Sequence, residues 1–189
     1  MRITSTPKLI PGSAQVLETE ELDAAITPFD DIHKIVQRIP GVNVSEEDGY
    51  GLRPNIGIRG SGSERSSKIT LMEDGILIAP APYSAPSAYY FPTTGRMRAL
   101  EVRKGSSQIK YGPQTNGGAL NFISTEIPED FTLDSTLSFG SDVARKGHIN
   151  LGASYQNFGW LVETYQLNTS GFKELDGGGD TGFSINDYL

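Results

Sequence analysis

The chain has 189 residues, of which 37% are hydrophobic, 22 are glycine and 11 are proline, and it carries a net charge of −7. Its length allows one medium domain or a small domain with part of another, and the many turn-forming residues disfavour an all-helical fold. The absence of cysteine excludes disulfides and thiolate zinc sites, and the negative charge argues against a protein that neutralises nucleic-acid phosphates.

The N-terminal region is predicted to be a tether followed by a strand and a helix. Residues 1–12 contain two prolines and no apolar run typical of an export signal, so the chain as written is expected to lack one. A short strand is predicted over 13–17. Thr27 and Pro28 provide a helix start, Pro40-Gly41 provides its end, and between them apolar residues recur at helical spacing: Phe29, Ile32, Ile35, Val36 and Ile39.

Short β-prone runs bounded by turn residues follow the helix. They lie at 42–44, 57–59, 69–72, 76–78, 100–102 and 120–123. Asp74-Gly75 separates two of them and predicts a hairpin turn, because these residues tolerate positive φ angles. Residues 1 to about 125 are therefore predicted to form a small α+β domain.

Longer strand-like segments occupy residues 128–189. They are predicted at 132–139, 148–156 and 160–169, and in the second segment Ile149, Leu151, Ala153 and Tyr155 alternate with polar residues and glycine. Such alternation is typical of transmembrane β-barrel strands and equally of strands in a soluble sandwich. Three strands cannot close a barrel, so on the barrel interpretation the chain is a fragment.

The local charge differs from the overall charge. Between Arg53 and Lys110 there are nine basic residues against four acidic ones. This excess is compatible with ion pairs to carboxylates elsewhere and with an attractive field for an anionic ligand, and both can hold together. Uncharged residues 79–92, rich in proline and aromatic rings, are expected either to present rings to a ligand or to pack them against a surrounding wall.

Motifs for catalysis, metals and nucleotides are weak. Residues 177–182 match G-x-G-x-x-G without room for the following helix, and 112–118 lacks the lysine of a phosphate loop. His33 and His148 have no metal-ligand spacing, and Ser63 is not in a G-x-S-x-G turn. We therefore expect no enzyme, no metal site and no cofactor.

The order of several motifs resembles the plug domain of the TonB-dependent outer-membrane transporters. These motifs are Ile39-Pro40-Gly41-Val42, Ile58-Arg59-Gly60, Asp74-Gly75, Val102 to Gly105, Tyr111-Gly112 and Gly117 to Phe122. Segments 46–49, 52–55 and 79–90 are similar to the branch of ferric dicitrate receptors. The resemblance implies a tether over 1–12, a plug with a small mixed sheet and short helices over 13–127, and the first antiparallel strands of a transmembrane β-barrel over 128–189.

The resemblance also implies site residues. In this family, substrate settles between outer loops and the plug's upward-facing loops, which would be 59–68 and 80–90 here. Candidate ligand contacts are Arg65, Tyr83, Ser84 and Tyr89. Arg59 and Arg103 are expected to form structural ion pairs between plug and barrel.

The implied activity is import of a ferric chelate, either ferric citrate or a siderophore, across the outer membrane. TonB, with ExbB and ExbD, would supply energy through a TonB box that the sequence does not contain, and the barrel would contact outer-membrane lipid. Nucleic acid is not an expected partner. The alternatives are import of a non-iron nutrient such as cobalamin or a saccharide, and a stand-alone soluble binding module.

Overall fold

The computed structural model describes residues 13–18, 32–47, 50–78, 90–105, 111, 116–179 and 181–189. They belong to two compact units that divide between Ser124 and Thr125. Within this described part of the chain, no helix is long and apolar enough to cross a membrane.

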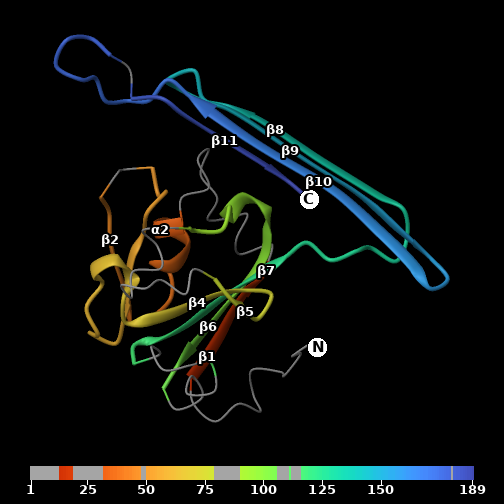
Figure 1. The fold of residues 1–189 in the computed structure, drawn as a ribbon, viewed down its shortest axis with the longest axis horizontal. Helices are drawn as coiled ribbons and strands as arrows, with labels where there is room; N and C mark the ends of the chain where they lie inside the picture. The colour runs from red at the N-terminus through yellow and green to blue at the C-terminus, as the bar shows by residue number, and fades with distance from the viewer. Residues whose placement is uncertain are drawn as a thin grey trace. The chain divides into compact units, whose positions relative to one another are not determined.

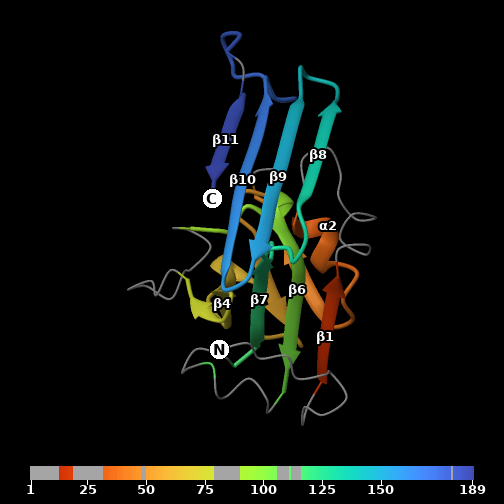
Figure 2. The same ribbon diagram turned by 90° about the vertical axis from the view of Figure 1, so that its right-hand side faces the viewer.

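The first unit contains a five-stranded mixed sheet in the order β1-β6-β7-β4-β5 (Figures 1 and 2). Its strands are β1 (Ser13–Glu18), β4 (Ile69–Glu73), β5 (Ile76–Leu77), β6 (Met97–Lys104) and β7 (Gly118–Ser124). The pairing is antiparallel except between β4 and β7, which run parallel. The parallel pair brings the residues before β4 and those before β7 to the same end of the sheet.

The hairpin predicted at Asp74-Gly75 is confirmed. It joins β4 to β5, and both turn residues have positive φ, 50° for Asp74 and 78° for Gly75. The Asp74 carboxylate accepts hydrogen bonds from the Ser124 amide at 3.0 Å and from its hydroxyl at 2.6 Å. This side chain therefore ties the hairpin to the end of β7.

Helix α2 (Ile32–Val36) and the hairpin of β2 (Val42–Ser45) and β3 (Asn55–Ile58) complete the first unit. The predicted helix start at 27–31 lies outside the described residues. The helix ends at Val36, before the predicted Pro40-Gly41, because the Ile39 amide donates to the Val36 carbonyl in a tighter three-residue turn. Proline next in sequence disfavours helical geometry at Ile39.

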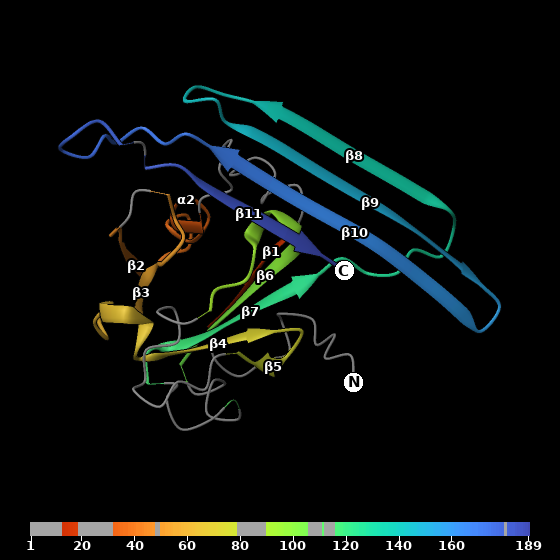
Figure 3. The same cartoon turned by 45° about the horizontal axis from the view of Figure 1, so that its top comes forward.

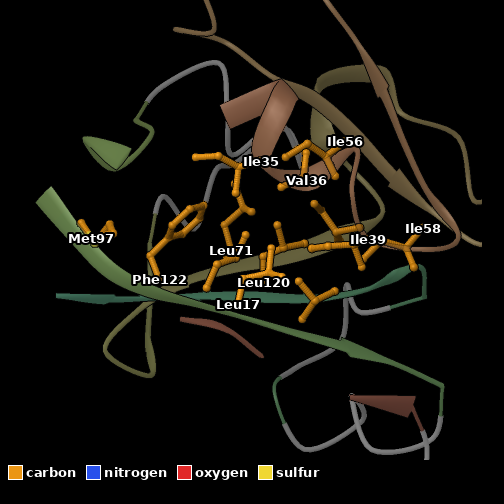
Figure 4. Packing of buried hydrophobic residues seen from close by; sticks show 13 residues of the cluster. Leu17, Ile35, Val36, Ile39, Ile56, Ile58, Leu71, Met97, Leu120 and Phe122 are labelled. Atoms are coloured by element: carbon orange, nitrogen blue, oxygen red, sulfur yellow. The ribbon is translucent and has the colours of Figure 1, made fainter. Parts of the chain in front are cut away.

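The core of this unit lies between the sheet and the layer of α2 and β3 (Figure 4). Ile35 and Val36 of the helix point toward Leu71 and Leu120 of the sheet, and all four are at most 2% exposed. Phe91 packs edge-on against Phe122, with ring centroids 5.2 Å apart. Burial of these side chains, at roughly 1.5–3 kcal/mol each, fixes the frame from which the loops project.

The second unit is an antiparallel sheet in the order β11-β10-β9-β8 (Figure 3). Its strands are β8 (Thr132–Phe139), β9 (Arg145–Tyr155), β10 (Phe158–Thr169) and β11 (Phe183–Tyr188). The three strands predicted in this part of the sequence are confirmed. The fourth, β11, was not predicted, because Phe183, Ile185 and Asp187 place a charge where the alternating pattern needs an apolar residue.

The two faces of this sheet differ in character. Leu133, Leu151 and Val162 are cross-strand partners on one face. Large side chains on that face are exposed: Leu133 58%, Leu137 73%, Phe139 77%, Ile149 44%, Tyr155 75%, Phe158 68%, Val162 55% and Tyr188 66%. On the opposite face, Glu163, Tyr165, Leu167 and Thr169 of β10 are buried.

Candidate ligand-binding site

The turn of residues 59–68, between β3 and β4, carries the candidate ligand contact that the structure describes. Its start is fixed by the Arg59 amide, which donates to the Gly41 carbonyl at 2.8 Å. Its end is fixed by the Lys68 carbonyl, which accepts from the Gly117 amide at 2.7 Å. A Cβ at Gly117 would lie 2.4 Å from Ser61 Oγ and 2.9 Å from the Lys68 carbonyl oxygen, so the close approach needs glycine there.

Arg65 lies on the exposed side of this turn, within a single 3₁₀ turn, η2 (Glu64–Ser66). Its amide donates to Asn55 Oδ1 at 2.6 Å. Among the described residues, none forms a hydrogen bond or an ion pair with its guanidinium. The backbone of Arg65 is therefore held in place, and its guanidinium group is positioned to bind an anion.

Arg59 occupies a different corner of the unit. Its amide meets Gly41 beyond the end of β3, whereas Arg65 is anchored at the start of β3. The Arg59 Nη1 atom lies 3.1 Å from where a Cβ of Gly105 would be. The structure thus separates the two arginines along β3, and they do not converge on one point.

Lys104 stands beside Arg59 with its side chain buried. Its Nζ donates to the Pro40 carbonyl at 2.7 Å. Burial of the ammonium lowers the pKa of Lys104 from its ordinary 10.5, and the Arg59 charge lowers it further. This corner is therefore electropositive, and an added carboxylate would stabilise it.

Arg103 is paired inside the first unit. It is 2% exposed, and its Nη2 donates a hydrogen bond to Glu101 Oε1 of the same strand. Asn121 Nδ2 lies 3.4 Å from the second Glu101 oxygen, and the guanidinium carbon lies 5.3 Å from the Tyr111 ring centre. An ion pair from Arg103 to the barrel, as the resemblance implies, remains a prediction.

The other three candidate contacts, Tyr83, Ser84 and Tyr89, lie outside the described residues. The chain is described again from Tyr90, whose hydroxyl lies 3.1 Å from Glu73 Oε2. Glu73 Oε1 accepts from Arg96 Nη2 at 2.8 Å, in the short helix η4 (Thr94–Arg96). The residues following the candidate loop are thus attached to β4.

Two side chains at the base of the 59–68 turn could not be predicted from the sequence. Asn55 Oδ1 accepts from the Arg65 amide, and the Ser66 hydroxyl bonds both the Ile56 amide at 3.0 Å and the Pro54 carbonyl at 2.8 Å. Both are buried, at 5% and 0% exposed. Isolated asparagine and serine residues in a polar loop give no sequence signal for this role.

The histidines and the glycine-rich segment that could have indicated a metal or nucleotide site lie in separate elements. His33 lies in α2, and His148 Nε2 lies 2.7 Å from Glu163 Oε1 in the second unit, where Thr125 also donates to that oxygen at 2.9 Å. Gly177 and Gly178 lie in a turn closed by the Gly178 amide and the Leu175 carbonyl. No group of three or more potential metal ligands is present in the described part of the chain.

A small mixed-sheet plug followed by antiparallel strands with an exposed apolar face defines the class of outer-membrane receptors in which a plug precedes a barrel. Residues 6–119 match the TonB-dependent Receptor Plug Domain family. The chain belongs to the TonB-dependent receptor family, which confirms the resemblance and the fold class predicted from the sequence.

Two curated relatives are vitamin B12 transporters. The chain is 32% identical to BtuB of Photobacterium profundum over 139 residues, which cover 74% of the chain and 21% of the relative. It is 26% identical to BtuB of Vibrio vulnificus over 166 residues, covering 88% of the chain and 25% of the relative. The chain thus spans about a fifth to a quarter of their length.

Solved structures give a second comparison. The ferric citrate transporter FecA in its unliganded form matches with a TM-score of 0.72 and 27% identity, over 94% of this chain and 28% of that one. The ferric yersiniabactin uptake receptor FyuA of Yersinia pestis matches in fold, with a TM-score of 0.63, 20% identity, and coverage of 93% and 27%. The relatives therefore differ in the nutrient that their names state.

Proposed function

We propose that this chain supplies the plug and first barrel strands of a TonB-dependent transporter that imports an anionic ferric chelate, ferric citrate or a siderophore, across the outer membrane. The observation that carries the proposal is Arg65, which is exposed on the turn of residues 59–68 while its backbone is held by Asn55. Ferric chelates built on carboxylates are anionic, and guanidinium groups bind carboxylate oxygens through paired hydrogen bonds.

The described residues support binding and transport better than catalysis. The turn offers positive charge and hydrogen-bond donors, and no nucleophile there is paired with a base. Transport would follow from ligand-dependent population of a plug conformation on which TonB, with ExbB and ExbD, acts from the periplasm. No bond in the substrate has to be broken.

The exposed apolar face of β8 to β10 supports placement in the outer membrane. Strands with one apolar and one polar face suit a barrel wall, with the apolar side chains toward lipid. The same face on a soluble protein would be an aggregation liability, so the alternative of a soluble binding module is disfavoured.

Cobalamin import is the second candidate, and the 32% identity to a vitamin B12 transporter favours it. The two candidates differ in the charge of the ligand, because cyanocobalamin has no net charge. We would titrate the purified protein in detergent with ferric citrate and with cyanocobalamin by calorimetry, and repeat both titrations with Arg65→Gln.

Ferric citrate should bind, and Arg65→Gln should weaken binding about tenfold. Lys34→Gln is the matched control, since it removes one exposed positive charge from α2 of the same unit. Binding of cyanocobalamin alone, unaffected by Arg65→Gln, would replace the ferric-chelate proposal with cobalamin import.

A further inference from the structure

Two consecutive residues of η2 have a backbone conformation that L-amino acids rarely adopt. Arg65 has φ 49° and ψ 26°, and Ser66 has φ 53°, although neither is glycine. Left-handed conformations at non-glycine residues persist only where the surrounding structure holds them, and they concentrate at functional sites. The turn that carries Arg65 is therefore held against its own backbone preference.

The contacts that hold it come from the base of β3. The Ser66 hydroxyl accepts from the Ile56 amide at 3.0 Å and donates to the Pro54 carbonyl at 2.8 Å. Asn55 Oδ1 accepts from the Arg65 amide at 2.6 Å. The Asn55 and Ser66 side chains are buried while Arg65 is exposed, so buried groups hold the backbone of an exposed charged residue.

We propose that Asn55 and Ser66 are positioning residues, which hold Arg65 in the strained turn so that its guanidinium meets the carboxylates of an anionic ferric chelate. The inference rests on the proposed function and adds residues that do not themselves contact the ligand. Without Asn55 or Ser66, the turn relaxes to negative φ and the guanidinium samples many positions. Fixing the guanidinium in one position when the ligand binds then costs conformational entropy, which lowers the affinity.

Arg65 is the cation to which this restraint applies. The Arg59 backbone is anchored at the opposite end of β3, by Gly41, and Lys68 ends the turn through its carbonyl bond to Gly117. Neither Arg59 nor Lys68 has an amide bonded to a buried side chain in the described structure. An arginine held in one position also binds a carboxylate better than a lysine does, because the guanidinium group forms two parallel hydrogen bonds with it.

The test is a double-mutant cycle on ferric citrate affinity, measured by calorimetry with the full chain in detergent. Asn55→Leu keeps the side-chain volume close and removes the acceptor. We expect Asn55→Leu and Arg65→Gln each to weaken binding about tenfold, and the double variant to bind no more weakly than Arg65→Gln alone. Ser66→Ala is the second variant and should behave like Asn55→Leu.

The cycle separates positioning from general damage to the fold. If Asn55→Leu leaves the affinity unchanged, or weakens it by the same factor with and without Arg65, the inference is overturned. Amide hydrogen exchange of β6 and β7 reports whether the variants keep the sheet intact.

A separate readout distinguishes this inference from the proposed function. If the unmodified protein does not bind ferric citrate, that choice of ligand fails, and positioning is judged from hydrogen exchange of the Arg65 amide. Exchange should accelerate about tenfold or more in Asn55→Leu and stay unchanged in Ser63→Ala, since Ser63 makes no side-chain capping bond. Unchanged exchange in Asn55→Leu would overturn the positioning role.

Discussion

Replacing Ser66 with alanine should loosen the turn of residues 59–68 selectively. Ser66 is fully buried, and its hydroxyl satisfies both the Ile56 amide and the Pro54 carbonyl. Alanine removes both bonds and adds no bulk. A buried backbone group without a partner costs about 1–3 kcal/mol, so the two together should lower the local free energy of opening by about 2–6 kcal/mol.

Hydrogen exchange followed by mass spectrometry measures this loss directly. Because about 1.4 kcal/mol corresponds to a factor of ten, the Ile56 amide should exchange about 30- to 20,000-fold faster in Ser66→Ala. Global unfolding is a poorer measure here, because the chain has two compact units that need not unfold together.

Ser63→Ala is the matched control, from the same turn and without a capping bond. It should leave the exchange of Ile56 unchanged. The reasoning fails if Ser66→Ala and Ser63→Ala give the same exchange rates, because the buried hydroxyl would then contribute nothing to the turn.

Two further changes test the charge and the apolar face. The folded chain releases the Lys104 proton below pH 10.5 and the unfolded chain keeps it until about that pH, so raising the pH toward 10.5 should increase the stability of the first unit. Lys104→Met should flatten this increase in denaturant titrations, and an equal slope in both proteins would contradict the burial argument. Val162→Arg, on the exposed apolar face, should cost about 2–4 kcal/mol for folding into lipid vesicles if that face meets hydrocarbon. Thr136→Arg, on the opposite face, should cost much less, and equal costs would argue against a lipid-facing role.

Local sequence patterns were sufficient for most strands. The Asp74-Gly75 turn and the alternation in β9 act over a few neighbouring residues, so the sequence alone indicates them. The end of α2 and the presence of β11 depend on more than pattern. The helix gives way to a tight turn ahead of Pro40, and β11 forms because its backbone pairs with β10.

The candidate site divides in the same way. Arg65 was predicted as a ligand contact through the motif order of the family, and the structure places it exposed on the 59–68 turn. Its supports, Asn55 and Ser66, could not be predicted, because a hydrogen bond across ten residues depends on how the loop folds back on β3. Tyr83, Ser84 and Tyr89 stay predictions.

The sequence by itself determined the family, the types of the elements and the positive balance of the loops, since these depend on residue order and composition. The tertiary structure decided which strands are neighbours, including the parallel pair of β4 and β7, and which charges are neutralised. The sequence alone does not show which side chain, if any, pairs with Arg103 or with Arg65. Only folding buries Arg103 against Glu101 and leaves Arg65 exposed, because pairing two charges depends on the distance between them in space.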